Sequence, residues 1–219
     1  MYDDDPDWQN YFGAIRNLYV SHPVAVDIAG TCESVNATQI KDLETCYRTF
    51  YHPSNMVLFV VGHIEPEQMM EMIRKNQAAK IFANPVPIKR EKINEPDEIA
   101  SAKTVTEMDV VMPKLTLAIK VNDLPETPYA RIRRELSMNI IMDLLFSKSS
   151  SLYHEWLGKG LINDTFGGFF TQERDYSYIQ IGGDTAKPDV LEQALKELVK
   201  QLPDYPFEEA DFERIRKKT

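Results

Sequence analysis

The chain has 219 residues, of which 43% are hydrophobic and 27% are charged, a composition typical of a globular protein with a sizeable core. Its formal net charge of -9 argues against a nucleic-acid or anionic-membrane partner, because the protein and the phosphates would repel each other. No apolar run is long enough to span a bilayer, and the first residues have neither the basic nor the apolar region of a signal peptide.

The first part of the chain is predicted to be mainly helical. Apolar residues three and four positions apart predict a helix over residues 4–20. A loop over residues 21–36 then leads to a helix over residues 38–51. Residues 56–61 (MVLFVV) are apolar at every position, which predicts a strand buried on both faces. Glu-Pro-Glu then opens a further helix over residues 65–80.

Residues 85–103 are rich in proline and charge, which predicts a linker or an exposed extended arm. After it, residues 104–112 and 114–121 alternate between polar and apolar, as half-buried strands do. An antiparallel strand pair is expected over residues 166–171 and 177–182. The remaining segments of this part are expected to be helices, over residues 129–147, 152–157, 188–202 and 208–218. Strands and helices without a regular βαβ alternation predict an α+β fold, with helices on one face of largely antiparallel sheets.

The chain contains no self-contained catalytic motif. None of its four histidines lies in an HExxH, HxxEH or Cys/His zinc pattern, and there is no GxSxG, P-loop or GxGxxG following a strand. The residues alone therefore predict no catalytic side chain and no metal ligand. The two cysteines, Cys32 and Cys46, form no CxxC pair, so we expect reduced thiols packed as small apolar groups in a reducing, cytoplasmic compartment. A disulfide between them is the less favoured alternative.

Several segments resemble the pitrilysin/insulinase/mitochondrial-processing-peptidase family of zinc metallopeptidases, in its bacterial branch with a two-half subunit. They are MYDDDPDWQNYF, HPVAVDIAGTCESV, YRTFYHPSNM and VLFVVGHIEPE, and SKSSSLYHEWLGKGLINDTFGGF is similar to the second repeat of the family. The resemblance implies two related half-domains, both truncated here. Residues 1–84 would be the C-terminal part of the first, zinc-bearing half-domain, residues 85–103 the linker, and residues 104–219 the second half-domain.

Members of this family bind zinc through an inverted HxxEH signature, in which the glutamate activates water. This chain has no such signature, so the resemblance implies a fragment of a zinc metalloendopeptidase, with zinc in the full-length parent and none in the fragment. The parent would cleave a peptide substrate enclosed between its two halves, and a homologous partner subunit is compatible with this organisation. The alternative is a non-catalytic structural or substrate-binding module.

The resemblance also implies three substrate-binding residues. Trp8 and Tyr11 correspond to aromatic residues that line the cleft on the primed side of the scissile bond. Thr31, in the Gly-Thr loop, corresponds to a threonine of the same subsite wall. For the two aromatic residues, simple helix packing is the alternative.

Overall fold

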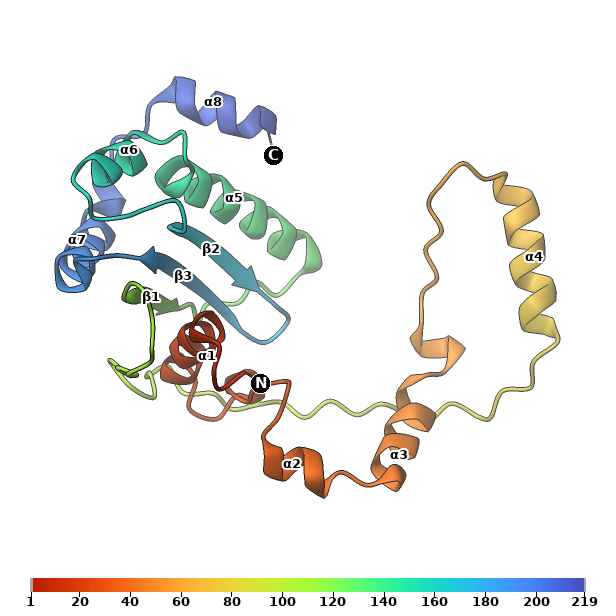
Figure 1. Ribbon diagram of the computed structural model, residues 1–219. Coiled ribbons are helices and arrows are strands. Elements are labelled where there is room, and N and C mark those ends of the chain that lie inside the picture. The colour runs from red at the N-terminus through yellow and green to blue at the C-terminus, as the bar shows by residue number, and fades with distance from the viewer. Residues whose placement is uncertain (1, 219) are drawn as a thin grey trace. The chain divides into compact units, whose positions relative to one another are not determined.

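The computed structural model describes residues 2–218, which form two compact units (Figure 1). Unit 1 combines Met1–Asp27 with Ile93–Thr219, and unit 2 is Ile28–Lys92. These units differ from the half-domains that the resemblance implies, because the first helix of the chain packs on the sheet of unit 1. The division into half-domains around residues 85–103 stays a prediction.

Unit 1 is built on a three-stranded antiparallel sheet in the order β1-β3-β2. The strands are β1 (Lys114–Lys120), β2 (Gly167–Gln172) and β3 (Ser177–Asp184). The predicted hairpin is confirmed, since β2 and β3 pair from Gly167 opposite Gly182 to Gln172 opposite Ser177. Together with the surrounding helices, this sheet confirms the α+β class.

Five helices surround the sheet, close to their predicted positions. Asp5 caps the first, because its side chain accepts hydrogen bonds from two backbone amides of the opening turn. Thr127 and Ser150 cap two others, and the side chain of each accepts a hydrogen bond from one backbone amide. No helix of the described residues is long and apolar enough to cross a membrane. The helices are α1 (Pro6–Leu18), α5 (Pro128–Phe146), α6 (Ser151–Gly158), α7 (Pro188–Gln201) and α8 (Glu209–Lys218).

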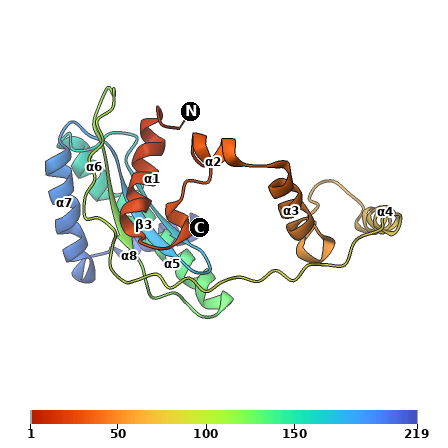
Figure 2. The same ribbon diagram turned by 90° about the horizontal axis from the view of Figure 1, so that it is seen from below.

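The two faces of the sheet pack against different helices (Figures 1 and 2). Because side chains alternate along a strand, Phe170 and Ile181 point into the main core, which α5, α6 and α7 complete. The opposite face carries Tyr178, which packs with Ile15 and Leu18 of α1. Helices α5 to α7 thus cover one face, as expected, and α1 covers part of the other.

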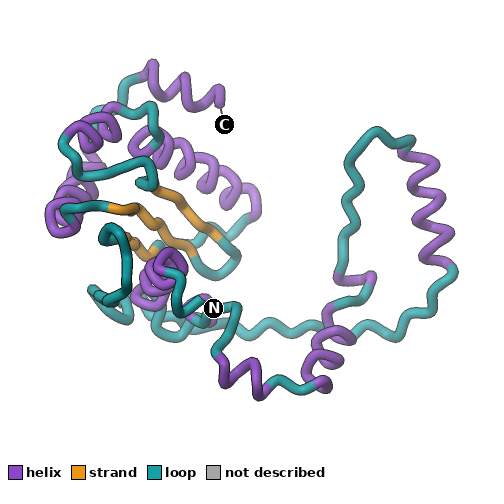
Figure 3. The backbone as a smooth tube through the Cα atoms, in the orientation of Figure 1, coloured by secondary structure: helices purple, strands orange, loops and turns teal. Residues whose placement is uncertain are grey.

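Unit 2 contains α2 (Cys32–Ala37), α3 (Ile40–Phe50) and α4 (Pro66–Ala78), and its described residues form no strand (Figure 3). The loop expected up to residue 36 is therefore wrong at its end, where Thr31 and Ser34 form a capping box for α2. Both cysteines are free thiols, and they are exposed rather than packed.

The predicted buried strand over residues 56–61 is wrong for this structure. Its side chains are exposed, up to 97% at Val61. A strand needs a neighbour for its backbone amides and carbonyls, and the described part of unit 2 offers none. The strand predicted over residues 104–112 of unit 1 is also wrong. The alternation of polar and apolar residues there is not sufficient to form a strand.

We expect Gly182→Ala to lower the free energy of unfolding by about 1–3 kcal/mol or more, because β3 and β1 approach too closely there for a side chain. A Cβ at Gly182 would overlap the carbonyl oxygen of Leu115. Gly167→Ala is the matched control, because Gly167 lies opposite Gly182 in the register and has open space around it. Urea unfolding of the two variants tests this, and equal losses would contradict it.

Candidate functional site

Helix α1 presents a row of aromatic side chains on one side. The Nε1–H group of Trp8 donates a hydrogen bond of 2.7 Å to Oδ2 of Asp27, which fixes the orientation of the indole. The ring of Tyr2 stacks on Trp8 at 4.4 Å, and the ring of Phe12 lies 4.7 Å from it. Trp8 is half-buried, so part of the indole remains open to solvent.

Tyr11 continues this row onto the sheet. Its hydroxyl lies 2.9 Å from the hydroxyl of Tyr178, within hydrogen-bond distance. Its ring stacks on Phe169 of β2 at 6.3 Å. Burial and the hydrogen bond with Tyr11 raise the pKa of Tyr178, so this phenol stays protonated at physiological pH. We call Trp8, Tyr11 and Phe169 the aromatic patch; the buried Tyr178 supports Tyr11 from the sheet.

The patch lies beside the open edge of β2. In an antiparallel pair, only every second residue exchanges backbone hydrogen bonds with its neighbour. The amide of Glu173 donates to the carbonyl of Tyr176, which sets this alternation along the hairpin. The backbone groups of Gly168, Phe170 and Gln172 therefore point away from β3. Among the described residues no other strand pairs with this edge.

The structure brings two of the three expected substrate-binding residues together. Trp8 and Tyr11 have rings 6.3 Å apart. Thr31 belongs to unit 2, where its Oγ1 accepts a hydrogen bond from the amide of Ser34, and its role in substrate binding stays a prediction. Sequence reasoning missed Phe169. Its signal was available, since adjacent residues of a strand face opposite sides and only one of Phe169 and Phe170 can enter the main core.

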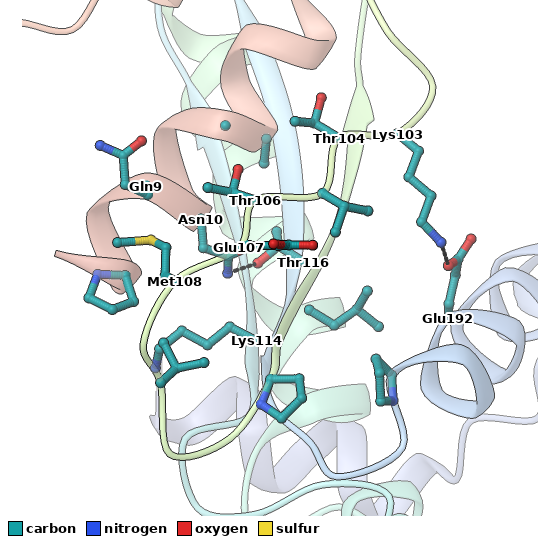
Figure 4. Close-up of a pocket in the computed structure, with 18 of the residues that line it drawn as sticks. Gln9, Asn10, Lys103, Thr104, Thr106, Glu107, Met108, Lys114, Thr116 and Glu192 are labelled. Carbon is teal, nitrogen blue, oxygen red and sulfur yellow. Dashed lines mark hydrogen bonds and ion pairs between the residues drawn. The ribbon is translucent and has the colours of Figure 1, made fainter. Parts of the chain in front are cut away.

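A cavity of about 480 Å³ lies in unit 1 beside α1 (Figure 4). It is lined by α1, β1, the segment around residues 103–113 and the start of α7. Within it, Nδ2 of Asn10 donates to Oγ1 of Thr116 at 2.7 Å, and Lys103 pairs with Glu192 at 2.6 Å. Hydrogen bonds from Lys103 and Lys196 lower the pKa of Glu192 to about 2, so both ends of this pair are charged at neutral pH.

The described residues do not fit a zinc site. Among residues 2–218, no three histidine, cysteine, aspartate or glutamate side chains gather closely enough to hold a metal ion. No residue of this chain is therefore assigned as a zinc ligand. What the arrangement offers is an aromatic surface next to outward-facing backbone groups of β2, the kind of edge to which an extended peptide can add.

The fold and this site define an α+β domain with an aromatic patch beside a strand edge, and comparison with known proteins identifies its family. Residues 38–219 match the family described as the peptidase M16 inactive domain. The chain is 41% identical over 199 residues to the zinc protease YmfH of Bacillus subtilis, which is 91% of this chain and 46% of YmfH. It is 22% identical over 219 residues to the zinc protease PqqE of Helicobacter pylori, at 98% of this chain and 48% of PqqE.

Solved structures agree. An M16-like peptidase from Alicyclobacillus acidocaldarius has a TM-score of 0.92 and 34% identity, with 100% of this chain and 51% of that chain covered. The chain therefore belongs to the M16 peptidase family, and the resemblance to zinc metallopeptidases is confirmed. It spans about half the length of the curated relatives that it matches.

Two adjacent phenylalanines provide a test of the site. Phe170 is only 8% exposed and belongs to the main core, so Phe170→Ala should lower the free energy of unfolding by about 3–5 kcal/mol. Phe169 is 44% exposed, so Phe169→Ala should cost less than about 1 kcal/mol. Chemical denaturation measures both. Comparable losses would show that Phe169 is a core residue and not part of a binding surface.

Proposed function

We propose that this chain is a substrate-binding, non-catalytic part of a zinc metallopeptidase that cleaves peptides enclosed between two half-domains. Membership in the M16 family, and relatives that are named zinc proteases, support the class of enzyme. The observation that carries the substrate-binding role is the position of the aromatic patch beside the open edge of β2. Cleavage itself would fall to residues outside this chain, because residues 2–218 form no zinc site.

An extended peptide would add to β2 as a further strand. The outward-facing backbone groups of Gly168, Phe170 and Gln172 would supply sequence-independent hydrogen bonds. Alternate side chains of the peptide would then lie on the face of the sheet that carries Phe169 and Tyr11. Aromatic rings there bury apolar area with little loss of conformational entropy, so they favour substrates with bulky apolar side chains.

A second candidate function is a non-catalytic structural or substrate-binding module, whose parent protein carries no zinc site of its own. The matched family describes an inactive domain, which favours such a role in a partner subunit of an active enzyme. The parent gene separates the two candidates. An HxxEH signature upstream supports the peptidase, and its absence supports the non-catalytic module.

Unit 2 contains apolar residues that have no packing neighbours among its described residues. Residues 56–61 are exposed and unpaired, and α3 has no buried residue. We propose that polypeptide of the parent protein outside this chain covers them.

We predict that the purified 219-residue chain binds no stoichiometric zinc and cleaves no peptide. The reason is that its described residues form no cluster of metal ligands. Metal analysis after dialysis and a quenched fluorescent peptide assay measure the two properties. Peptide cleavage that a chelator abolishes would contradict this prediction.

In the parent enzyme, we predict that Phe169→Ala raises KM for a peptide substrate about three- to tenfold, with little change in kcat. A lost aromatic contact of about 0.5–1.5 kcal/mol predicts a change of this size. Phe207→Ala is the matched control, because Phe207 is equally open at 42% exposed but its ring lies in a tilted contact with Tyr205, 5.0 Å between centroids, outside the patch. Equal effects of both variants, or unchanged KM in Phe169→Ala, would remove the patch from substrate binding.

A further inference from the structure

One carboxylate in unit 1 collects four hydrogen bonds from distant parts of the chain. Glu95 accepts from three successive backbone amides, those of Val20 (2.9 Å), Ser21 (2.8 Å) and His22 (2.7 Å). It also accepts from Nζ of Lys120 at 2.6 Å. The partners lie at the end of α1 and on β1, so a single side chain joins three segments.

Lys120 completes the arrangement from the sheet. Its ammonium group also donates to the carbonyl oxygens of Pro96 (2.7 Å) and Glu98 (2.9 Å), so all three of its protons are used. It lies 5.1 Å from the centre of the Tyr19 ring, within the range of a cation–π contact. The Lys120 side chain is 3% exposed and that of Glu95 is 13% exposed, so the charges are withdrawn from solvent.

Burying two charges is costly unless each has partners for all its polar atoms, and here both do. Burial acts to raise the pKa of Glu95, but the bonds from Lys120 and from the three amides outweigh it and lower the pKa to about 2. Charge-assisted hydrogen bonds of this kind are shorter and stronger than neutral ones. The pair is therefore charged and fastened throughout the physiological pH range.

The position of this pair in the chain gives it a further consequence. The chain leaves unit 1 after Asp27 and returns to it at Ile93. Residues 20–22 come just before the exit, and residues 95–98 come just after the return. The segments of unit 1 next to both connections are therefore bonded to Lys120 or Glu95.

We infer that the Glu95–Lys120 pair is a common anchor that fastens the exit segment (residues 20–22) and the return segment (residues 95–98) of unit 1 to one point of β1. Two independent tethers would let the exit and the return segment move separately. A common anchor makes the two segments move together. The ordered part of unit 1 then stops at a defined residue on each segment. This device does not depend on the proposed peptidase function.

Hydrogen exchange of backbone amides in the 219-residue chain tests the anchor. In Glu95→Gln, the amides of Val20, Ser21 and His22 should exchange about 10- to 100-fold faster, because their charged acceptor is gone. Glu98→Gln is the matched control, since it makes the same change three residues away on an exposed side chain and keeps the carbonyl that Lys120 uses. The buried amide of Ile181 should be unaffected in both variants.

Lys120→Met is the second variant. It should accelerate hydrogen exchange of the amides of residues 20–22. It should also make residues 95–98 more sensitive to limited proteolysis, because the carbonyls of Pro96 and Glu98 lose their donor. In the unsubstituted 219-residue chain, the amides of residues 20–22 should exchange more slowly than in Glu95→Gln at neutral pH. This difference in exchange rate should shrink as the pH falls from about 4.5 towards 2, where Glu95 becomes protonated in the folded state.

Three results would overturn the inference. The first is unchanged exchange at residues 20–22 in Glu95→Gln. The second is an equal acceleration at Ile181, which would make the pair a general stabiliser rather than a local anchor. The third is complete unfolding of both variants, because the inference requires that unit 1 keeps its core without the pair.

Discussion

Strand β3 is paired along both edges, and the arrangement of unit 1 depends on this. Its odd-numbered residues, from Ser177 onward, exchange backbone hydrogen bonds with β1, while the even-numbered residues do so with β2. The pairing fixes the register, and a strand in fixed register sends successive side chains to opposite faces. Ile181 therefore reaches the main core, and Tyr178 reaches α1. Among residues 2–218, no strand pairs with the outer edge of β1 or of β2.

Local patterns predicted much of this fold. The helix ending at Ala78 and the hairpin of β2 and β3 rely on spacing and turn chemistry that lie within about twenty residues of sequence. Residues 56–61 show the limit. Their apolar run describes what a strand would bury, but strand formation also needs a second strand, and the described part of unit 2 has none.

The candidate site was predictable only in part. Trp8 and Tyr11 follow from a family resemblance, and strand alternation indicates that one of Phe169 and Phe170 lies outside the main core. The contact between Phe169 and Tyr11 joins residues 158 apart in sequence, and no local pattern predicts that contact. The role of Glu95 is harder still to predict from the sequence, because its partners lie about 75 residues before it and 25 after it. Within its own proline-rich segment it is one charged residue among several, and only the fold shows that it is withdrawn from solvent.

The exposed run at residues 56–61 has a practical consequence for handling the isolated chain. Six consecutive apolar residues with no charge and no proline are the kind of segment that pairs with identical copies of itself in cross-β aggregates. Natural proteins protect such edges with charge, proline or a covering element. Here the overall charge of -9 supplies only general repulsion, which salt screens. The solubility of the 219-residue chain should therefore decrease with ionic strength, even though unit 1 has a complete core.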